Sequence, residues 1–523
     1  MKTTHLPRLL LPLLLLAAGS CQVLNPYSRP ETATTGLYRD AATTDTISLA
    51  FQPWQQLFTD PLLQKLINEG LTNNRNLQVA VARIEQSQAL LAQSKAAFLP
   101  SLNGRATTTL SRARGSLVGT NAGGSTTTTG GTTTGGTTGG GTTGGGTTGG
   151  GTTGGGTTGG GTTGGGTNGN GTTTTDQSTI VTGGSPRQYL LALSSSWEAD
   201  VWGKLRSNKR SYVASVLQSE AYRRVVQTQL IADIADNYFY LLALDAQLEI
   251  TRQTVQNRIK DVETMRLLKE GDVVTEAAVV QSEAQRYAAE VTIPDLERNI
   301  RETENLMATL LGRAPRPIER STLAAQPSTP PLLTGVPGQL LRNRPDVQQA
   351  EYAFQSSFEL TNAARAYFYP SFTITANGGL ISSTIDNLFS PTAIFASVVG
   401  GLSQPIFSQG LNRARLRRSE ALQREYLATY QQTMFTAGQE VSNALFAYES
   451  AVQKARIRAQ QLAALDKAVD YTQELLRAGF ANYTEVLTAQ QSLLSAQLNS
   501  VNDALQQRQA VTDLYHALGG GWR

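Results

Sequence analysis

The sequence predicts a mainly α-helical chain with an internal duplication, in which four β-strands contribute to a membrane β-barrel and long helices form coiled-coil-like hairpins. Three observations predict this fold class. The segment NNRNLQVA at 73–80 returns as NRPDVQQA at 343–350, and AAFLPSL at 96–102 returns as AYFYPSF at 366–372. Residues 204–270 contain neither Gly nor Pro, and their apolar residues recur at helical spacing. Each repeated motif leads into alternating segments of about ten residues, the length of a tilted strand that crosses a bilayer.

Residues 1–20 have the composition of a signal peptide. Lys2 and Arg8 precede an apolar run at 9–18 that is too short to span a bilayer as a helix. Small residues then lead to Cys21, the only cysteine, in a pattern that resembles a bacterial lipoprotein signal. We expect Cys21 to be acylated and to insert its acyl chain into lipid, with ordinary signal-peptidase cleavage and a free thiol as the alternative. Residues 21–55 follow as an N-terminal extended segment.

The composition favours long packed helices and gives no sign of a nucleic-acid partner. Hydrophobic residues make up 40% of the chain and aromatic residues only 7%. The net charge of +4 is spread along the chain, and the basic run RARLRR at 413–418 is not interleaved with aromatic residues. Such a run is typical of a solvated helix face, because nucleic-acid sites combine basic residues with aromatic side chains that stack on bases.

The first structural repeat is predicted at 56–315. A helix at about 60–98 begins at Asp60-Pro61, and strands follow at about 101–113 and 188–202. Arg105 is a charge near the middle of the first strand, which suits a side chain that faces water. A helical hairpin at about 203–312 completes the repeat. Gly271 ends its first helix, Thr275 caps the next, and Pro294 is expected to bend or break the return helix.

A Thr/Gly-rich insert separates the first two strands. Residues 121–175 are almost entirely Thr and Gly, and 137–166 are tandem copies of TTGGG. Because this composition cannot bury apolar surface, we expect a disordered extracellular loop at about 115–186. No strand-turn-helix or Lys-Ser/Thr signature accompanies the glycines, so the sequence does not predict a phosphate-binding loop.

A linker at 316–337 precedes the second structural repeat at 338–523. Its first helix, at about 338–368, begins at Arg344-Pro345, where we interpret Arg344 and Asp346 as capping residues. Strands at about 371–383 and 393–407 and a helical hairpin at about 410–518 follow. In the two hairpins LLKEG at 267–271 aligns with LLRAG at 475–479, which pairs Gly271 with Gly479.

The number of strands predicts the oligomeric state. Four strands cannot close a barrel, and eight is about the smallest number that does so in a membrane. An open sheet in lipid would leave backbone groups at its edges without hydrogen bonds, at a cost of several kcal/mol per group. We therefore expect a homotrimer whose three chains form a 12-stranded barrel.

The chain resembles the TolC-like outer-membrane efflux proteins, and in particular their lipoprotein branch. Six segments carry this resemblance: LLRNRPDVQQAE at 340–351, WEADVWGKLR at 197–206, PDLERNI at 294–300, LSQPIF at 402–407, GFANYTEVL at 479–487 and LGGGW at 518–522. The resemblance implies a trimeric channel in the outer membrane whose barrel continues into an α-helical tunnel in the periplasm. It also implies contact with outer-membrane lipid, a periplasmic adaptor protein and an inner-membrane pump, which we expect to be of the RND type.

The resemblance further implies a gate where the two interhelical turns meet. The adaptor-docking tips would then include Gly271, Thr275, Glu276, Gly479 and Thr484. The family pattern places two acidic residues after the second turn; Glu485 occupies the first of these positions and Thr488 the second. Three copies of Glu485 would form a negative ring that favours cations, whereas the alternative is a solvated carboxylate at a helix start.

The sequence favours a channel over an enzyme. It contains no nucleophile-base pair, and its two histidines, His5 and His516, do not predict a metal site, so we expect no catalytic residues, no metal and no cofactor. Small-molecule efflux is the leading hypothesis. An outer-membrane channel for protein secretion is one alternative, and a trimeric surface adhesin with a coiled-coil stalk is another.

Overall fold

The computed structural model describes residues 24–30, 51–110, 187–326 and 344–522. The described chain is mostly helical with one four-stranded antiparallel sheet, which confirms the predicted fold class. It divides into a helical unit, which includes the strand residues next to the helices, and a strand unit of Leu102–Ser194 and Ala376–Ser397. The predicted signal peptide at 1–20, Cys21, the end of the first predicted strand from residue 111, the Thr/Gly-rich loop predicted at about 115–186 and the linker from residue 327 lie outside the described residues.

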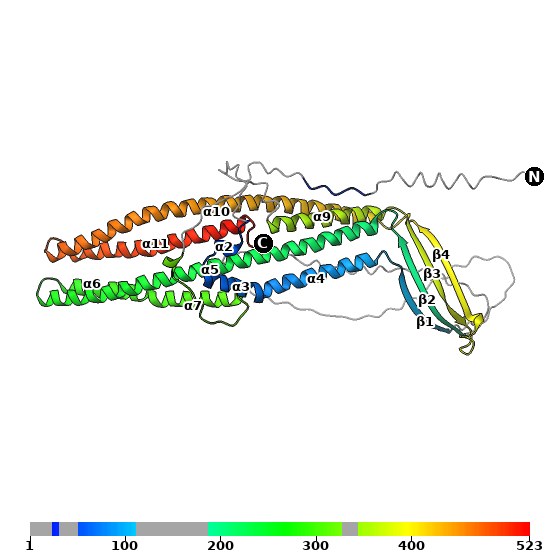
Figure 1. Ribbon diagram of the computed structural model, residues 1–523, viewed down its shortest axis with the longest axis horizontal. Helices are drawn as coiled ribbons and strands as arrows, with labels where there is room; N and C mark the ends of the chain where they lie inside the picture. The colour runs from blue at the N-terminus through cyan, green and yellow to red at the C-terminus, as the bar shows by residue number, and fades with distance from the viewer. Residues whose placement is uncertain (1–23, 31–50, 111–186, 327–343, 523) are drawn as a thin grey trace, which may run out of the picture. The chain divides into compact units, whose positions relative to one another are not determined.

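Each repeat supplies helix, strand, strand and helical hairpin in that order (Figure 1). The first repeat consists of α2 (Trp54–Leu57), α3 (Pro61–Asn73), α4 (Arg75–Ala96), β1 (Ser101–Leu110), β2 (Arg187–Ala199), α5 (Lys204–Glu270), α6 (Glu276–Glu290) and α7 (Thr292–Leu310). The second consists of α9 (Pro345–Ala366), β3 (Ser371–Ser382), β4 (Ile394–Ser403), α10 (Leu411–Arg477) and α11 (Tyr483–Ala517). Two short 3-10 helices are η2 (Leu323–Ala325) and η3 (Pro391–Ala393). Among the described helices we find none whose length and apolar character would let it cross a membrane.

The long helices of the two repeats match at one constant offset. Both α5 and α10 have 67 residues, and their first residues lie 207 positions apart (411 minus 204). Each follows a glycine with a φ of 79°, Gly203 and Gly410, a left-handed conformation that glycine adopts without strain. The repeat therefore extends from the start of the long helix to its end without insertion.

The helix predicted at about 60–98 is two helices. The side chain of Asn74 accepts a hydrogen bond from the backbone of Leu77 and caps α4, which breaks the helical run after Asn73. The start predicted at Asp60-Pro61 is confirmed, since the Asp60 carboxylate accepts a bond from Leu62 N at 2.9 Å. Asn favours the capping conformation over the helix interior, which explains the break.

The return helix of the first hairpin is interrupted near Pro294, as the sequence predicts. Helix α6 ends at Glu290 and α7 begins at Thr292. Proline has no N–H to donate to the carbonyl of Glu290 one turn earlier, so the break falls on the N-terminal side of Pro294. The corresponding helix of the second repeat, α11, runs unbroken for 35 residues.

The four strands are hydrogen-bonded in the order β1-β2-β3-β4, so β1 and β4 form the two edges. Gly379 allows two central strands to approach closely, because a Cβ there would overlap the backbone of Leu191 and Ala192. The sheet order shows that the strands of the two repeats lie side by side, with β2 next to β3.

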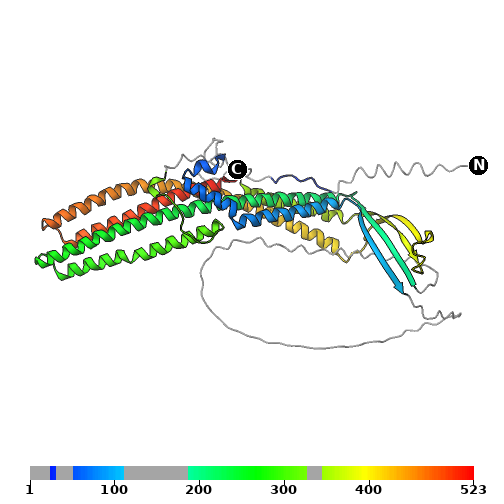
Figure 2. The same cartoon turned by 60° about the horizontal axis from the view of Figure 1, so that its bottom comes forward.

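The main hydrophobic core surrounds the middle of α5. Figures 1 and 2 show α3, α7 and α11 along this helix, and each of them contacts it. The largest fully buried side chains of this core are Leu63, Ile67, Ile231, Ile234, Tyr238, Leu241, Leu242, Met307, Leu311 and Leu514. Asp60 anchors the edge of the core: its carboxylate accepts hydrogen bonds from the Tyr238 hydroxyl at 2.7 Å and from the Ser321 hydroxyl at 2.6 Å.

Residues 24–30 lie against α9. The side-chain amide of Asn362 donates to the Asn25 carbonyl at 2.9 Å and accepts from the Asn25 backbone at 3.3 Å. The ring of Tyr27 lies 6.0 Å from that of Phe354 and 5.6 Å from that of Phe358. Two reciprocal hydrogen bonds and an aromatic cluster therefore fix this part of the N-terminal segment on the helical unit.

Arg344 occupies the N-cap position of α9 as predicted, but its side chain makes no capping hydrogen bond and forms long-range contacts instead. The Arg344 side chain is buried; it donates to the Ala517 carbonyl at 2.7 Å and pairs with Asp346 at 2.6 Å and Glu440 at 2.7 Å. Burial by itself lowers the pKa of Arg344, but Asp346 and Glu440 together raise it above its ordinary value. Arg344 thus joins the start of α9 to α10 and to the end of α11.

The same contact exists in the first repeat with a different side chain. The position equivalent to Arg344 is Asn74 (344 minus 270), and its side-chain amide donates to the Leu310 carbonyl at 2.8 Å. Leu310 is in turn equivalent to Ala517 (517 minus 207). In each repeat, therefore, the residue at the start of the helix that leads into the strands satisfies a carbonyl at the end of the return helix, which would otherwise lack a partner.

We predict that Arg344→Ala destabilises the protein by about 3 kcal/mol, because it leaves two carboxylates and a helix-end carbonyl without their partner. Thermal unfolding in detergent, followed by circular dichroism, measures the effect. Arg316→Ala is the control, since the Arg316 side chain is 64% exposed. Equal unfolding temperatures for the two variants would contradict the prediction.

Candidate functional site

The candidate site is formed by the helical tips, which we define as the turns at 271–275 and 478–482 with the helix ends that flank them. Both turns end a long helix in the same way. Val273 N donates to the Leu268 carbonyl and Phe480 N donates to the Leu475 carbonyl, each at 2.9 Å. This hydrogen bond, from a backbone N–H to the carbonyl five residues earlier, is the mark of a Schellman C-cap. The tips are thus ordered turns that begin from matching helix ends.

The structure changes how the two turns are paired. The left-handed residue is Gly479 in the second turn, with a φ of 77°, but it is Asp272 in the first, with a φ of 57°. Gly271 has an ordinary φ of −87°. The equivalent of Gly479 is therefore Asp272 (479 minus 207), and the sequence alignment of Gly271 with Gly479 is wrong by one residue. Asp tolerates the left-handed conformation better than most residues, so the chain needs no glycine at this position.

The residues proposed for adaptor docking are all at the surface. Gly271, Thr275, Glu276, Gly479 and Thr484 are each exposed. Thr275 occupies the N-cap position of α6 as predicted, but its side chain makes no capping hydrogen bond. Lys269 and Glu276 form an ion pair across the first turn.

A small hydrophobic cluster joins the two hairpins at the tips. It contains Met265 of α5, Val279 of α6 and three residues of the first turn of α11, Tyr483, Val486 and Leu487. The Tyr483 hydroxyl donates to the Ser282 hydroxyl at 2.8 Å inside this cluster. Because Tyr483 lies on the second hairpin and Ser282 on the first, this buried bond joins the two hairpins.

Further from the turns, the contact between α5 and α11 becomes polar. Gln490 donates to Asp261 at 3.1 Å, and Arg258 donates to Gln491 at 3.2 Å. Burial lowers the pKa of Arg258 and raises that of Asp261, because each charged form has lost water. In this region single hydrogen bonds between charged and amide side chains join α5 to α11, in place of the large apolar side chains of the main core.

The two candidate gate residues face away from the tip cluster. Glu485 and Thr488 are exposed on α11, while the neighbouring Val486 and Leu487 are buried. Thr488 bonds through its hydroxyl to the carbonyl of Thr484 at 2.8 Å, one turn earlier in the same helix. Glu485 lies in the first turn of α11, where its charge also interacts favourably with the helix dipole. The position of Glu485 therefore fits both of the sequence-based interpretations.

Two apolar residues at the tips were not singled out from the sequence. Phe480 is 83% exposed and Val273 is 68% exposed, and they occupy equivalent positions in the two turns (480 minus 207). Large apolar side chains in short turns are unusual unless a partner covers them. A search for apolar residues within two positions after the helix-ending glycines would have found both.

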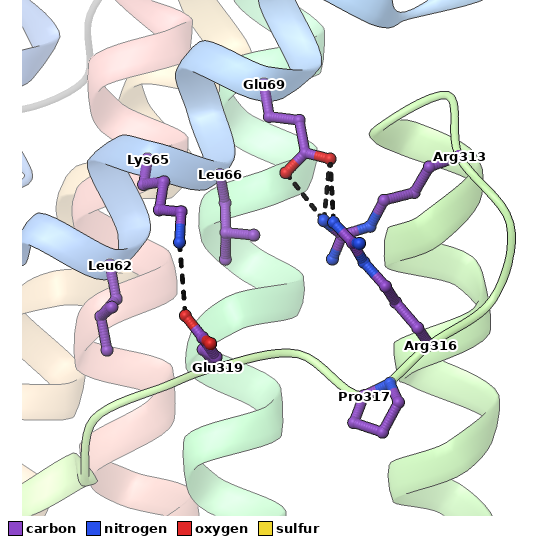
Figure 3. A pocket seen from close by; sticks show the side chains of 8 residues that line it. All are labelled: Leu62, Lys65, Leu66, Glu69, Arg313, Arg316, Pro317 and Glu319. Atoms are coloured by element: carbon purple, nitrogen blue, oxygen red, sulfur yellow. Dashed lines mark hydrogen bonds and ion pairs between the residues drawn. The ribbon is translucent and has the colours of Figure 1, made fainter.

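A separate pocket of about 350 Å³ lies between α3 and the segment after α7 (Figure 3). Its charged side chains pair with one another: Arg313 with Glu69 at 2.8 Å and Lys65 with Glu319 at 3.3 Å. These pairs leave little free charge for a ligand, so we assign the pocket a structural role. Within the described residues, no group of three or more His, Cys, Asp or Glu side chains is placed to hold a metal ion.

A titratable group lies at the contact of α5 and α11. Asp236 is half-buried, and its buried Oδ1 atom has no hydrogen-bond partner in the described part of the chain. Burial, with the nearby charges of Asp513 and Asp233, raises the pKa of Asp236 to about 7. Burial raises the pKa values of Asp233 and Asp513. His516 lies close to both carboxyl groups and offsets part of this rise.

The long helices and the four-stranded sheet give the chain the fold of known outer-membrane channels. The family model "Outer membrane efflux protein" matches residues 160–313 and 336–520. The chain belongs to this family, and its location is the outer membrane. The predicted resemblance to TolC-like efflux proteins is thereby confirmed.

Named relatives and solved structures agree with this assignment. The chain is 27% identical over 522 residues to the solvent efflux pump outer membrane protein SrpC of Pseudomonas putida, covering 97% of each chain. It is 31% identical over 332 residues to the pyoverdine export outer membrane protein OpmQ of Pseudomonas putida, covering 63% of this chain and 70% of that protein. Its fold matches the outer-membrane channel OprN with a TM-score of 0.76 at 23% identity, covering 96% of this chain and 100% of the other. The open-state MtrE channel of Neisseria gonorrhoeae matches with a TM-score of 0.75 at 23% identity, covering 96% and 99%.

We predict that Tyr483→Phe loosens the tips. The variant loses the buried bond to Ser282, worth about 1 kcal/mol, so amide hydrogen exchange in α6 should become about fivefold faster. Ser282→Ala should have a similar effect, and the double variant should add little, because both changes remove one bond. Tyr471→Phe is the control, since Tyr471 is 62% exposed. Unchanged exchange in α6 would contradict the assignment of this bond to the tip contact.

We predict that Asp236 makes the protein less stable as the pH rises. Its folded pKa of about 7 lies above the ordinary aspartate value of 3.8, so the folded state binds the extra proton between these values and stability falls across this window. Asp236→Asn should remove that fall and raise stability at pH 8 by about 1–2 kcal/mol. Unfolding temperatures at pH 5 and pH 8 test this, with the exposed Asp295→Asn as the control. An unchanged pH dependence in Asp236→Asn would disprove it.

Proposed function

We propose that the protein is a homotrimeric outer-membrane conduit for small-molecule efflux. The observation that carries this proposal is the open sheet: four strands in the order β1-β2-β3-β4 leave unpaired edges at β1 and β4. In lipid these edges must be paired, and three chains supply twelve strands for a closed barrel. The chain acts by conduction and carries out no catalysis.

The surface of α10 supports contact between chains. Phe446 is 72% exposed and Phe435 is 61% exposed on this helix. A groove of about 740 Å³ between α10 and α11 is lined by Phe446 and Leu445 together with polar side chains such as Gln506. Apolar side chains of this size on one helix face favour burial against a neighbouring chain, which the trimer provides.

The tips are proposed to meet the other parts of the pump. Exposed Phe480 and Val273 give the turns an apolar surface that suits a periplasmic adaptor protein. An inner-membrane pump of the RND type would supply the energy, and this chain would supply the exit. The family, and relatives named as solvent, toluene and antibiotic efflux proteins, favour small apolar molecules as substrates over secreted proteins.

The N-terminal segment supports a lipid anchor at Cys21. Cys21 precedes the fixed residues 24–30 by only three positions, and Leu24 lies close to Gly203 at the junction of β2 and α5. An acyl chain on Cys21 would add a second attachment to the outer membrane. Radiolabelled palmitate should be incorporated into the chain and lost in Cys21→Ser, and equal labelling of both would exclude acylation at this residue.

We predict that Glu485→Gln weakens cation selectivity, because three exposed carboxylates would be lost from the proposed gate. In planar bilayers the potassium-to-chloride permeability ratio should fall by about twofold or more. Glu474→Gln removes another exposed carboxylate, on the other side of the same turn, and serves as the control. A ratio that is unchanged in Glu485→Gln would remove Glu485 from the gate.

The function itself is tested in a deletion strain. Loss of the protein should sensitise cells to solvents, dyes and antibiotics, and the wild-type chain should restore resistance. Chemical crosslinking and size measurement in detergent report the trimer. Unchanged sensitivity across the panel would contradict small-molecule efflux, and a chain that stays monomeric would contradict the conduit.

A further inference from the structure

Within the described strands, one charge lies in the middle of a strand. Among the strand residues that the structure describes, the charged ones are Arg105, Arg187 and Glu198. Arg187 is the first residue of β2, and Glu198 near the end of β2 pairs with Lys204 at 2.5 Å. Arg105 is the fifth residue of the ten-residue strand β1. A mid-strand cation is costly on a lipid-facing surface, so the face that carries Arg105 is expected to be the one turned away from lipid.

The two faces of β1 differ in character. Leu102 and Leu110 are 71% and 72% exposed and share one face with Gly104, by the alternation of a strand. A Cβ on Gly104 would lie 3.6 Å from the Leu193 side chain of β2, and Leu193 is 57% exposed. This face of the sheet therefore presents leucines from two adjacent strands.

Arg105 lies on the opposite face. Its Nε atom donates to the hydroxyl of Thr107 at 3.0 Å, so both side chains are on the same side of β1. Asn103 and Thr109 belong to this face by the same alternation, which makes it polar along the whole strand. A barrel wall that is apolar on one face and polar on the other places its polar face toward the water-filled lumen.

We propose that Arg105 forms a ring of three guanidinium groups inside the barrel that favours anionic solutes on their way out. This inference rests on the proposed trimeric barrel and adds a selectivity element to it. An Arg side chain stays charged at every physiological pH, so the ring acts constantly. Rings of Arg or Lys side chains raise the local concentration of anions in pores, as carboxylate rings do for cations. The barrel would thus select by the opposite charge from that of the candidate gate residue Glu485.

The test measures the reactivity of a reporter cysteine beside Arg105. Asn103→Cys places a thiol two residues away on the polar face, and intact cells are treated with membrane-impermeant anionic and cationic methanethiosulfonates. We expect the anionic reagent to be favoured, and the ratio of anionic to cationic rates to fall at least about threefold when Arg105→Gln is added. The readout does not require transport through the tunnel. The chain without an introduced cysteine gives the background from Cys21.

Two controls separate this inference from a general charge effect. Arg187→Gln removes the same charge from the start of β2 and should leave the ratio unchanged. Gly104→Cys, on the apolar face, should react with neither reagent. Labelling of Gly104→Cys but not of Asn103→Cys, or a ratio unaffected by Arg105→Gln, would overturn the inference.

The proposed function is measured separately in the same cells. The size of the extracted protein in detergent reports the trimer. A monomer would contradict the proposed conduit, whereas a trimer whose reagent ratio ignores Arg105→Gln would contradict only the arginine ring.

Discussion

The long helix α5 needs neighbours along its length, and much of the chain is arranged to provide them. A helix of 67 residues is stabilised mainly by burial of an apolar stripe, since its own hydrogen bonds contribute little in water. On α5 this stripe includes Ile231, Ile234, Tyr238 and Leu241, all fully buried. Helices α3, α7 and α11 cover it. The stripe therefore decides where both return helices lie, and with them the tips that they carry.

The contact between the hairpins differs along α5, and this difference matters for a gate. Around the middle of α5 a large apolar core holds α7 and α11, whereas near the tips a cluster of five buried residues and a few polar bonds remain. Local opening is cheapest where buried apolar contacts are few. Opening at the tips would therefore cost less free energy than opening of the core. A gate at Glu485 requires such a gradient in stability, because the rest of the tunnel must keep its shape.

Local patterns predicted most of the fold, and long-range contacts account for what they missed. The span of α5 follows from the absence of Gly and Pro between 204 and 270, and the strand starts follow from the repeated motif before Ser101 and Ser371. The role of Arg344 depends on Ala517, which is 173 residues away, and no local pattern reveals that contact. The bond between Tyr483 and Ser282 is hidden for the same reason. At the first turn, Asp272 takes the conformation usually given to glycine, so residue identity alone misplaced the repeat by one position.

The duplication preserves positions rather than residues, and this explains how the repeats could diverge. Asn74 and Arg344 occupy equivalent positions, and each donates to a carbonyl at the end of its own return helix. The amide of Asn74 meets this need alone and also caps α4. A guanidinium has more donors than one carbonyl can use, so Arg344 also requires Asp346 and Glu440, and its burial commits those carboxylates to the second repeat. Exchanging the two residues should therefore destabilise the protein in both directions. Arg344→Asn would leave the two acids unpaired, and Asn74→Arg would bury a positive charge without an acid to pair with it.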